Sequence, residues 1–161
     1  MKAVRMHDFG GPEVLMVDEV ERPEPASGEV LIKVRAASVN PIDYKMREGA
    51  YLKREQLPTT LGRDVAGQVE RCGEDVGDLK PGDEVFVLLD QGHGGYAEYV
   101  TASAQNCAKA PKGLSEIEAA ATPLAAMTAW QGLFDKGGLA SGQSVLIHGA
   151  AGGVGHFAVQ L

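Results

Sequence analysis

The sequence of 161 residues is poor in cysteine, and this scarcity excludes two classes of protein. Its two cysteines, Cys72 and Cys107, lie far apart and form no C-x-x-C pair, so neither a disulfide framework nor a cysteine zinc cluster is expected. A reducing cytoplasm is therefore the default location. Both thiols are interpreted as small apolar residues that fill the core.

Basic residues and long apolar runs are also scarce. Lys and Arg number 15 against 22 Asp and Glu, which gives a net charge of −7 and argues against a nucleic-acid partner held by cationic contacts. No run approaches the ~20 apolar residues that cross a bilayer, and the charged N-terminal residues do not resemble a secretory leader. With 44% apolar residues, the chain can still build a globular core.

Up to about Pro111 the pattern consists of short apolar segments separated by Gly and Pro turns, which predicts a mostly antiparallel β domain. The predicted strands cover residues 3–6, 14–20, 30–39, 65–69, 85–89 and 96–100. The strand at 85–89 is apolar throughout, so we expect it to be buried on both faces.

From Ser115 onward the pattern becomes helical. Ser115 stands three residues before Glu118 as in a capping box, and Thr122-Pro123 offers a second N-cap with proline at the first helical position. Gly137-Gly138 is expected to end the second helix. The predicted elements are helices at 116–121 and 123–135 and a buried strand at 144–148.

A glycine turn, Gly149-Ala-Ala-Gly-Gly-Val-Gly155, follows the predicted strand and opens a further helix. Glycines let backbone amides approach a pyrophosphate, and a helix N-terminus presents free N–H groups to the same anion. The spacing G-x-x-G-x-x-G differs from the usual G-x-G-x-x-G, and such turns also serve packing, so both interpretations stay open on the pattern alone. The residue that selects NAD or NADP is expected ~20 residues further on, beyond Leu161.

Six stretches, in order along the chain, resemble the medium-chain dehydrogenase/reductase superfamily, in particular its zinc-independent, zeta-crystallin-like quinone oxidoreductase branch. They cover residues 37–49, 61–67, 80–85, 94–100, 125–130 and 149–155. Residues 57–67 and 133–139 are especially similar to the reticulon-4-interacting oxidoreductases. The resemblance implies a mixed α/β fold: a GroES-like β-barrel catalytic domain over 1–114, followed in 115–161 by connecting helices and the first βα unit of a truncated Rossmann domain.

The resemblance also implies an activity. It is the NADPH-dependent transfer of hydride to a quinone or an α,β-unsaturated carbonyl, carried out by a homodimer when the protein is complete. Two alternatives stay open: a non-catalytic GroES-like interaction or scaffold protein, and an enoyl-thioester reductase. Because a single βα unit cannot form a parallel sheet with covered faces, we expect this chain alone to bind dinucleotide poorly and to be inactive.

No metal is expected. Zinc-dependent members of the superfamily carry their ligands at the positions of Asn40, Arg63-Asp64 and about Leu124, and these residue types are poor zinc ligands. Arg63 and Asp64 could form an ion pair in place of the metal or a solvated pair of little weight. The four histidines, at positions 7, 93, 148 and 156, show no ligand spacing.

The candidate catalytic residues are Asn40, Asp43, Tyr44 and Lys45. Asn40 and Asp43 match family residues near the nicotinamide, although both also suit the start of a helix, as N-cap and as a partner of the helix dipole. Tyr44 or Lys45 is expected to hydrogen-bond the acceptor oxygen or to supply a proton. Lys45 is favoured, because the tyrosine more common in the family falls at this position, while Ile42 and Met46 at i, i+4 mark the buried side of the helix and leave Tyr44 pointing elsewhere; solvent is the alternative donor.

The candidate cofactor-binding residues are Thr128, Ala151, Gly152, Gly153, Val154 and Gly155. The turn is expected to hold the pyrophosphate. Thr128 falls where family members contact the nicotinamide or ribose, although a helical threonine commonly bonds only its own preceding turn. Tyr51 is interpreted either as part of the acceptor pocket or as simple packing.

Overall fold

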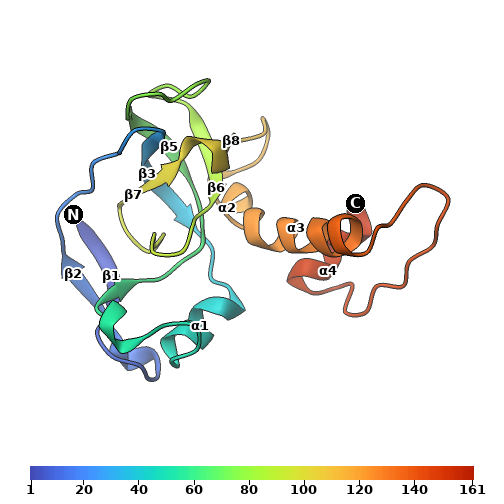
Figure 1. Cartoon of the computed structure of the whole chain (residues 1–161), viewed down its shortest axis with the longest axis horizontal. Coiled ribbons are helices and arrows are strands. Elements are labelled where there is room, and N and C mark those ends of the chain that lie inside the picture. The colour runs from blue at the N-terminus through green and yellow to red at the C-terminus, as the bar shows by residue number, and fades with distance from the viewer. The chain divides into compact units, whose positions relative to one another are not determined.

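Antiparallel pairing of short apolar strands builds the first part of the computed structural model, which describes residues 1–161. The chain divides into two units, Met1–Ala121 and Thr122–Leu161. The first unit contains a five-stranded sheet of order β7-β3-β5-β6-β8 and a three-stranded sheet of order β2-β1-β4 (Figure 1). The strands are β1 (Lys2–Met6), β2 (Leu15–Glu19), β3 (Glu29–Ala37), β4 (Thr59–Thr60), β5 (Asp64–Cys72), β6 (Glu84–Leu88), β7 (Tyr99–Ser103) and β8 (Cys107–Lys109).

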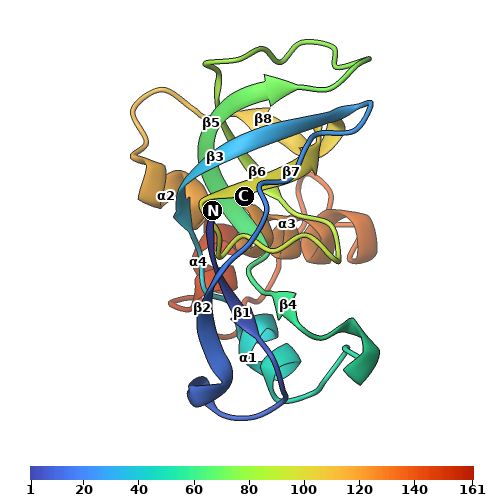
Figure 2. The ribbon, with the colours of Figure 1, turned by 90° about the vertical axis from the view of Figure 1, so that its left-hand side faces the viewer.

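Backbone hydrogen bonds through residues 96–98 connect the two sheets. Val4 N donates to Tyr96 O at 2.7 Å, Glu98 N donates to Lys2 O at 3.1 Å, and Val34 N donates to Glu98 O at 2.9 Å. Figure 2 shows β1 and β2 below the strongly curved pair β3 and β5. The predicted antiparallel β domain is confirmed, and its two sheets are joined through this segment.

The main core is formed by residues of the five-stranded sheet and is made mainly of β-branched residues. Its buried members are Val30, Ile32, Val65, Val69, Val85, Val87, Leu89, Val100 and Ala102. The opposite face of β6 is also covered, because Phe86 packs against Ala119 and Ala120 of α2 (Glu116–Ala120). This explains why the segment 85–89 is apolar on both faces, as the sequence predicted.

Besides shifts of one to three residues at the ends of other strands, three elements of the β domain differ from the sequence-based expectation. The strand expected at 96–100 begins only at Tyr99, because residues 96–98 bond to β1 and β3 rather than to a single ladder. Strands β4 and β8 were not predicted, since segments of two and three residues carry no readable alternation. Helix α1 (Pro41–Arg47) begins at Pro41 as expected.

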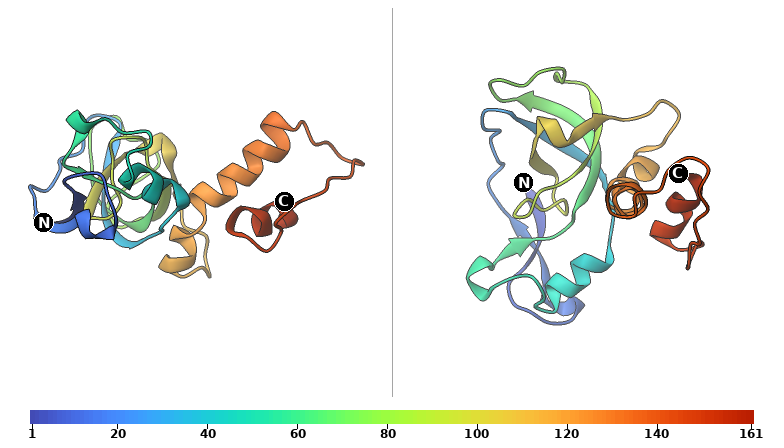
Figure 3. Two further views of the ribbon diagram at one scale, coloured as in Figure 1. Left: turned by 90° about the horizontal axis from the view of Figure 1, so that it is seen from below. Right: turned by 45° about the vertical axis from the view of Figure 1, so that its right-hand side comes forward.

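The second unit contains two helices and the connection between them (Figure 3). Helix α3 (Pro123–Trp130) continues as π-helical turns over Gln131–Lys136, and it contacts α4 (Gly153–Gln160). The predicted helix at 123–135 is therefore confirmed. None of the helices in the chain has the length and apolar character that a membrane-spanning segment requires.

The strand expected at 144–148 is wrong for this structure. These residues form no strand, and Val145 and Leu146 are 50% and 79% exposed. The apolar pattern is that of a buried strand, but a strand needs a neighbour for its backbone hydrogen bonds, and no strand in the chain pairs with this segment.

Candidate active site

A buried carboxylate, Asp43, lies at the start of α1 and is only 3% exposed. Its oxygens accept three hydrogen bonds: from Asn40 N at 2.7 Å, from the Tyr96 hydroxyl at 2.8 Å and from Gly62 N at 3.2 Å. A buried charge is tolerated only when donors replace the water it has lost. Asp43 therefore ties α1 to the turn before β5 and to the segment before β7.

A second buried carboxylate, Asp64, lies at the start of β5 and is fully buried. Its Oδ2 accepts from Ser38 Oγ at 2.5 Å and from Asn40 Nδ2 at 2.9 Å, and Asn40 Nδ2 also donates to Ser38 Oγ at 2.8 Å. Asn40 thus joins both acids, with its backbone N–H on Asp43 and its side chain on Asp64. The structure brings together Asn40 and Asp43, which the sequence singled out, with Ser38 and Tyr96, which it did not.

The Tyr96 hydroxyl is kept protonated by its surroundings. Burial raises the pKa of this phenol, and the hydrogen bond that it donates to Asp43 raises it further, because ionisation would place two negative charges in contact. Tyr96 therefore acts as a fixed donor to Asp43. It lies in the segment 94–100, and its position after Gly94-Gly95 was the one signal in the sequence that could have indicated it.

A cavity of about 240 Å³ opens beside this network, within the first unit. Ile42 and Met46 of α1 line it, which agrees with their expected place on the inner side of that helix. Tyr51 also lines it, with a left-handed backbone (φ 66°) and a side chain that is 73% exposed. The full lining is Ile42, Met46, Tyr51, Leu52, Gln56, Thr59, Thr60, Leu61, Gly62, Arg63, Gln91, Gly92 and His93.

The two candidate proton donors lie on the outer side of α1. Tyr44 is 46% exposed, Lys45 is exposed, and neither lines the cavity. The role proposed for Lys45 therefore depends on the reach of a flexible side chain.

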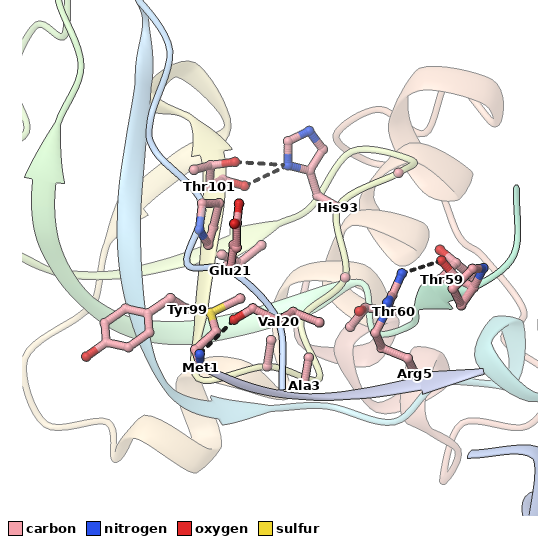
Figure 4. Close-up of a pocket in the computed structure, with 16 residues that line it drawn as sticks. Met1, Ala3, Arg5, Val20, Glu21, Thr59, Thr60, His93, Tyr99 and Thr101 are labelled. Carbon is pink, nitrogen blue, oxygen red and sulfur yellow. Dashed lines mark hydrogen bonds between the residues drawn. The ribbon is translucent and has the colours of Figure 1, made fainter. Parts of the chain in front are cut away.

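A larger cavity of about 390 Å³ is also lined by His93 (Figure 4). His93 Nδ1 is 2.9 Å from Thr101 O; since that oxygen can only accept, Nδ1 carries the proton. Thr59, Thr60, Gly92 and His93 line both cavities. In the chain, no group of three or more His, Cys, Asp or Glu side chains is placed to hold a metal ion.

The glycine turn of the second unit has the local geometry of an anion site. Gly149 adopts φ +68°, and Gly152 is the N-cap of α4 without a side-chain cap. A Cβ at Gly155 would lie 2.2 Å from Gly149 O, so only glycine permits the helix to start this close to the turn. The first amides of α4, from Gly153 onward, are therefore available to a ligand.

Thr128, on α3, donates its hydroxyl to Leu124 O at 2.6 Å. This is the local bond to the preceding turn that a helical threonine commonly makes. Because the side chain is exposed, its hydroxyl can still accept a hydrogen bond from a ligand.

Comparison with known proteins supplies the family. A family model described as the alcohol dehydrogenase GroES-like domain matches residues 26–112. The chain is 44% identical to the quinone oxidoreductase of Lama guanicoe, over all of this chain and 49% of that protein. It is also 44% identical to the 2-methylene-furan-3-one reductase of Solanum lycopersicum, over all of this chain and 44% of that protein.

Among solved structures, a mycobacterial protein complexed with NADPH matches with a TM-score of 0.87 and 36% identity. The match covers 99% of this chain and 49% of that one. The chain thus spans about half the length of the curated relatives it matches. The resemblance and the mixed α/β, GroES-like fold expected from the sequence are confirmed.

Removing the Tyr96 hydroxyl should destabilise the first unit. Tyr96→Phe takes away one donor to a buried carboxylate, so we expect the free energy of unfolding at pH 7 to fall by about 1.5–3 kcal/mol in urea titrations. Because the pKa of Tyr96 is raised in the folded state, the free energy of unfolding of the wild type should fall as pH rises above about 10, the pKa of an unperturbed tyrosine. Tyr96→Phe should lack this part of the pH dependence. Tyr44→Phe, on an exposed ring, is the control; equal stability of both variants would contradict the role of Tyr96.

Gly62 is expected to tolerate no side chain. It adopts φ +96°, and a Cβ there would lie 2.6 Å from the Tyr96 ring. Gly82 has φ +94° with nothing within 4 Å, so Gly82→Ala measures the backbone penalty alone, about 1–2 kcal/mol. Thermal and urea unfolding should show a clearly larger loss for Gly62→Ala, and a loss no greater than that of the control would show that Tyr96 does not constrain this turn.

Proposed function

The chain belongs to the alcohol dehydrogenase GroES-like domain family, and on that premise we propose that it provides the catalytic domain of a zinc-independent, NADPH-dependent reductase of quinones or α,β-unsaturated carbonyls. The names of two similar proteins, a quinone oxidoreductase and a 2-methylene-furan-3-one reductase, support this class of acceptor. The observation that carries the proposal is the position of Asn40. It hydrogen-bonds both buried carboxylates where zinc-dependent members of the superfamily are expected to hold their metal.

The residues at this place do not fit a zinc ion. Zinc prefers thiolate and neutral imidazole ligands in a tetrahedron. Here Asp64 Oδ2 is occupied by donors from Ser38 and Asn40, and the adjacent residue is the permanently charged Arg63. We therefore propose chemistry without a Lewis acid, which suits an acceptor that is already electron-poor.

The glycine turn fits the pyrophosphate of a dinucleotide. We propose that the backbone from Ala151 to Gly155, with Gly152, Gly153 and Val154 between them, holds this group through the first amides of α4. Thr128 is proposed to contact the nicotinamide or ribose. When bound, NADPH would supply the hydride. One similar structure is complexed with NADPH and another is described as NAD-dependent, so the proposal of NADPH rests on the resemblance to the quinone oxidoreductase branch.

Asn40 and Asp43 are proposed to form the wall beside the reacting atoms, held by the hydrogen bonds described above. Lys45 is proposed to deliver the proton that the acceptor oxygen requires, in preference to Tyr44, because the tyrosine more common in the family falls at the Lys45 position. We further propose that the complete protein is a cytoplasmic homodimer. Its partner is a small-molecule acceptor, and neither nucleic acid nor a membrane is a partner.

The activity can be tested in a chimera. The chain is joined at Leu161 to the C-terminal half of the mycobacterial protein that binds NADPH, since it covers 49% of that protein. We expect the chimera to oxidise NADPH in the presence of quinones or enones, followed by loss of nicotinamide absorbance. The chain alone should bind NADPH weakly and reduce nothing. A folded chimera that binds NADPH but reduces no acceptor would favour a scaffold role instead.

A matched pair of glycine variants tests, in the same chimera, whether the glycine turn binds the cofactor. Gly155→Ala forces a Cβ against Gly149 O, whereas Gly132→Ala introduces a Cβ with nothing within 4 Å. Calorimetric titration should show NADPH affinity reduced at least about tenfold, or ~1.4 kcal/mol, in the first variant only. Equal affinities would remove the turn from the cofactor site.

Lys45→Met is expected to lower kcat/KM of the chimera by about 100-fold, which is the lower range of a general-acid contribution. The loss should be accompanied by a changed pH profile, because a titrating donor has been removed. Lys112→Met, at an exposed position outside α1, serves as the control. Full kcat/KM in Lys45→Met would assign the proton to solvent.

A further inference from the structure

Arg63 is the one permanently charged side chain that lines the 240 Å³ cavity. It lies in the turn between β4 and β5, and its backbone and side chain are both attached to the same residue. Leu89 N donates to Arg63 O at 2.6 Å, and Arg63 Nε donates to Leu89 O at 2.9 Å. This double connection fixes the guanidinium plane and leaves its two terminal nitrogens as further donors.

No carboxylate neutralises this guanidinium by direct contact. Arg63 forms no ion pair in the structure, and the cavity lining contains no Asp or Glu. Of the two nearby acids, Asp43 accepts hydrogen bonds from Asn40, Gly62 and Tyr96, and Asp64 accepts from Ser38 and Asn40. A half-buried cation without an anionic partner is a strong candidate for binding an anionic oxygen of a ligand.

The remaining lining indicates the rest of that ligand. Ile42, Met46, Leu52 and Leu61 supply an apolar wall, and the Tyr51 ring stands at the same cavity. The volume lies below the ~300–1,000 Å³ typical of sites for drug-sized ligands, so a single ring fits better than a polycyclic system.

We propose that Arg63 binds the oxygen on which negative charge develops when a single-ring quinone or a small cyclic enone is reduced, an inference that rests on the proposed function. In an enone, hydride adds to the β-carbon, the C=C π pair forms a new bond between the α-carbon and the carbonyl carbon, and the carbonyl π pair moves to the oxygen to give an enolate. In a quinone, hydride adds to one carbonyl oxygen and the electrons move through the ring to the opposite oxygen, which gives a hydroquinone monoanion. A proton then neutralises the oxygen. The guanidinium stabilises the anion before protonation by charge and by paired hydrogen bonds, and so takes the place of a Lewis acid.

The proposal is tested by binding 4-nitrophenol to the 161-residue chain without coenzyme. The phenolate form of this probe resembles the hydroquinone monoanion and absorbs in the visible range. We expect the bound probe to ionise at lower pH than the free probe, because Arg63 favours the anion. If the wild type leaves the ionisation of the probe unchanged, the proposal is wrong, whatever the variants do.

Three arginine variants locate the effect. Arg63→Met should abolish the shift and weaken phenolate binding at least tenfold, Arg63→Lys should retain part of both, and Arg71→Met, on an exposed arginine of β5, should change neither. The neutral analogue 4-nitroanisole should bind the wild type and Arg63→Met equally, which shows that the cavity is intact. If Arg63→Met disturbs the cavity, the test rests on Arg63→Lys, which keeps the positive charge. Complete loss of the shift in the ionisation of the probe in Arg63→Lys would overturn the inference.

Failure of this inference is distinguishable from failure of the proposed function. A chimera that reduces quinones while Arg63→Met still binds phenolate normally would disprove only the role of Arg63. Phenolate held by Arg63 in a chimera that binds NADPH and reduces no acceptor would instead disprove the reductase, and with it the catalytic meaning of the contact.

Discussion

The buried Asp43 carboxylate is the constraint on which the rest of the first unit depends. A charge removed from water must be surrounded by donors, and the chain supplies them from three places that are distant in sequence: Asn40, Gly62 and Tyr96. Satisfying this one group fixes α1, the turn before β5 and the segment that joins the two sheets. The 240 Å³ cavity is lined by α1 and by the turn before β5, two of the elements that these hydrogen bonds hold in place.

Asp43, Asp64 and Arg63 are charged residues of the same region, but they have different roles. Asp43 and Asp64 are fully provided with donors and serve to position the backbone and Asn40. Arg63 is fixed by Leu89 but carries donors that no protein group uses in an ion pair. The two carboxylates therefore serve the structure, whereas the Arg63 guanidinium has donors that a ligand can use.

The site residues show how far sequence reasoning reached. Asn40 and Asp43 were singled out by their match to family residues near the nicotinamide, and their role there stays a prediction. The Asn-Pro signal predicted their place at the start of a helix, which the structure confirms. Ser38 carries no local signal of this site, and Gly94-Gly95 marks Tyr96 without showing which residues it contacts, because only folding brings these segments together. Ile42 and Met46 were correctly placed on one side of α1 by helical periodicity, but the same periodicity could not reveal that this side faces a cavity.

By itself the sequence determined the antiparallel β domain, the helices after Ser115, the glycine turn and the family, because these depend on local propensity, short-range periodicity and motifs in order. Only the tertiary structure decided the rest. The pattern at 144–148 predicted a strand that has no partner here. The start of β7 follows from the bonds of residues 96–98 to β1 and β3. Which donors surround Asp43, and that Arg63 keeps its charge unpaired, are properties of contacts between distant segments, which no local pattern encodes.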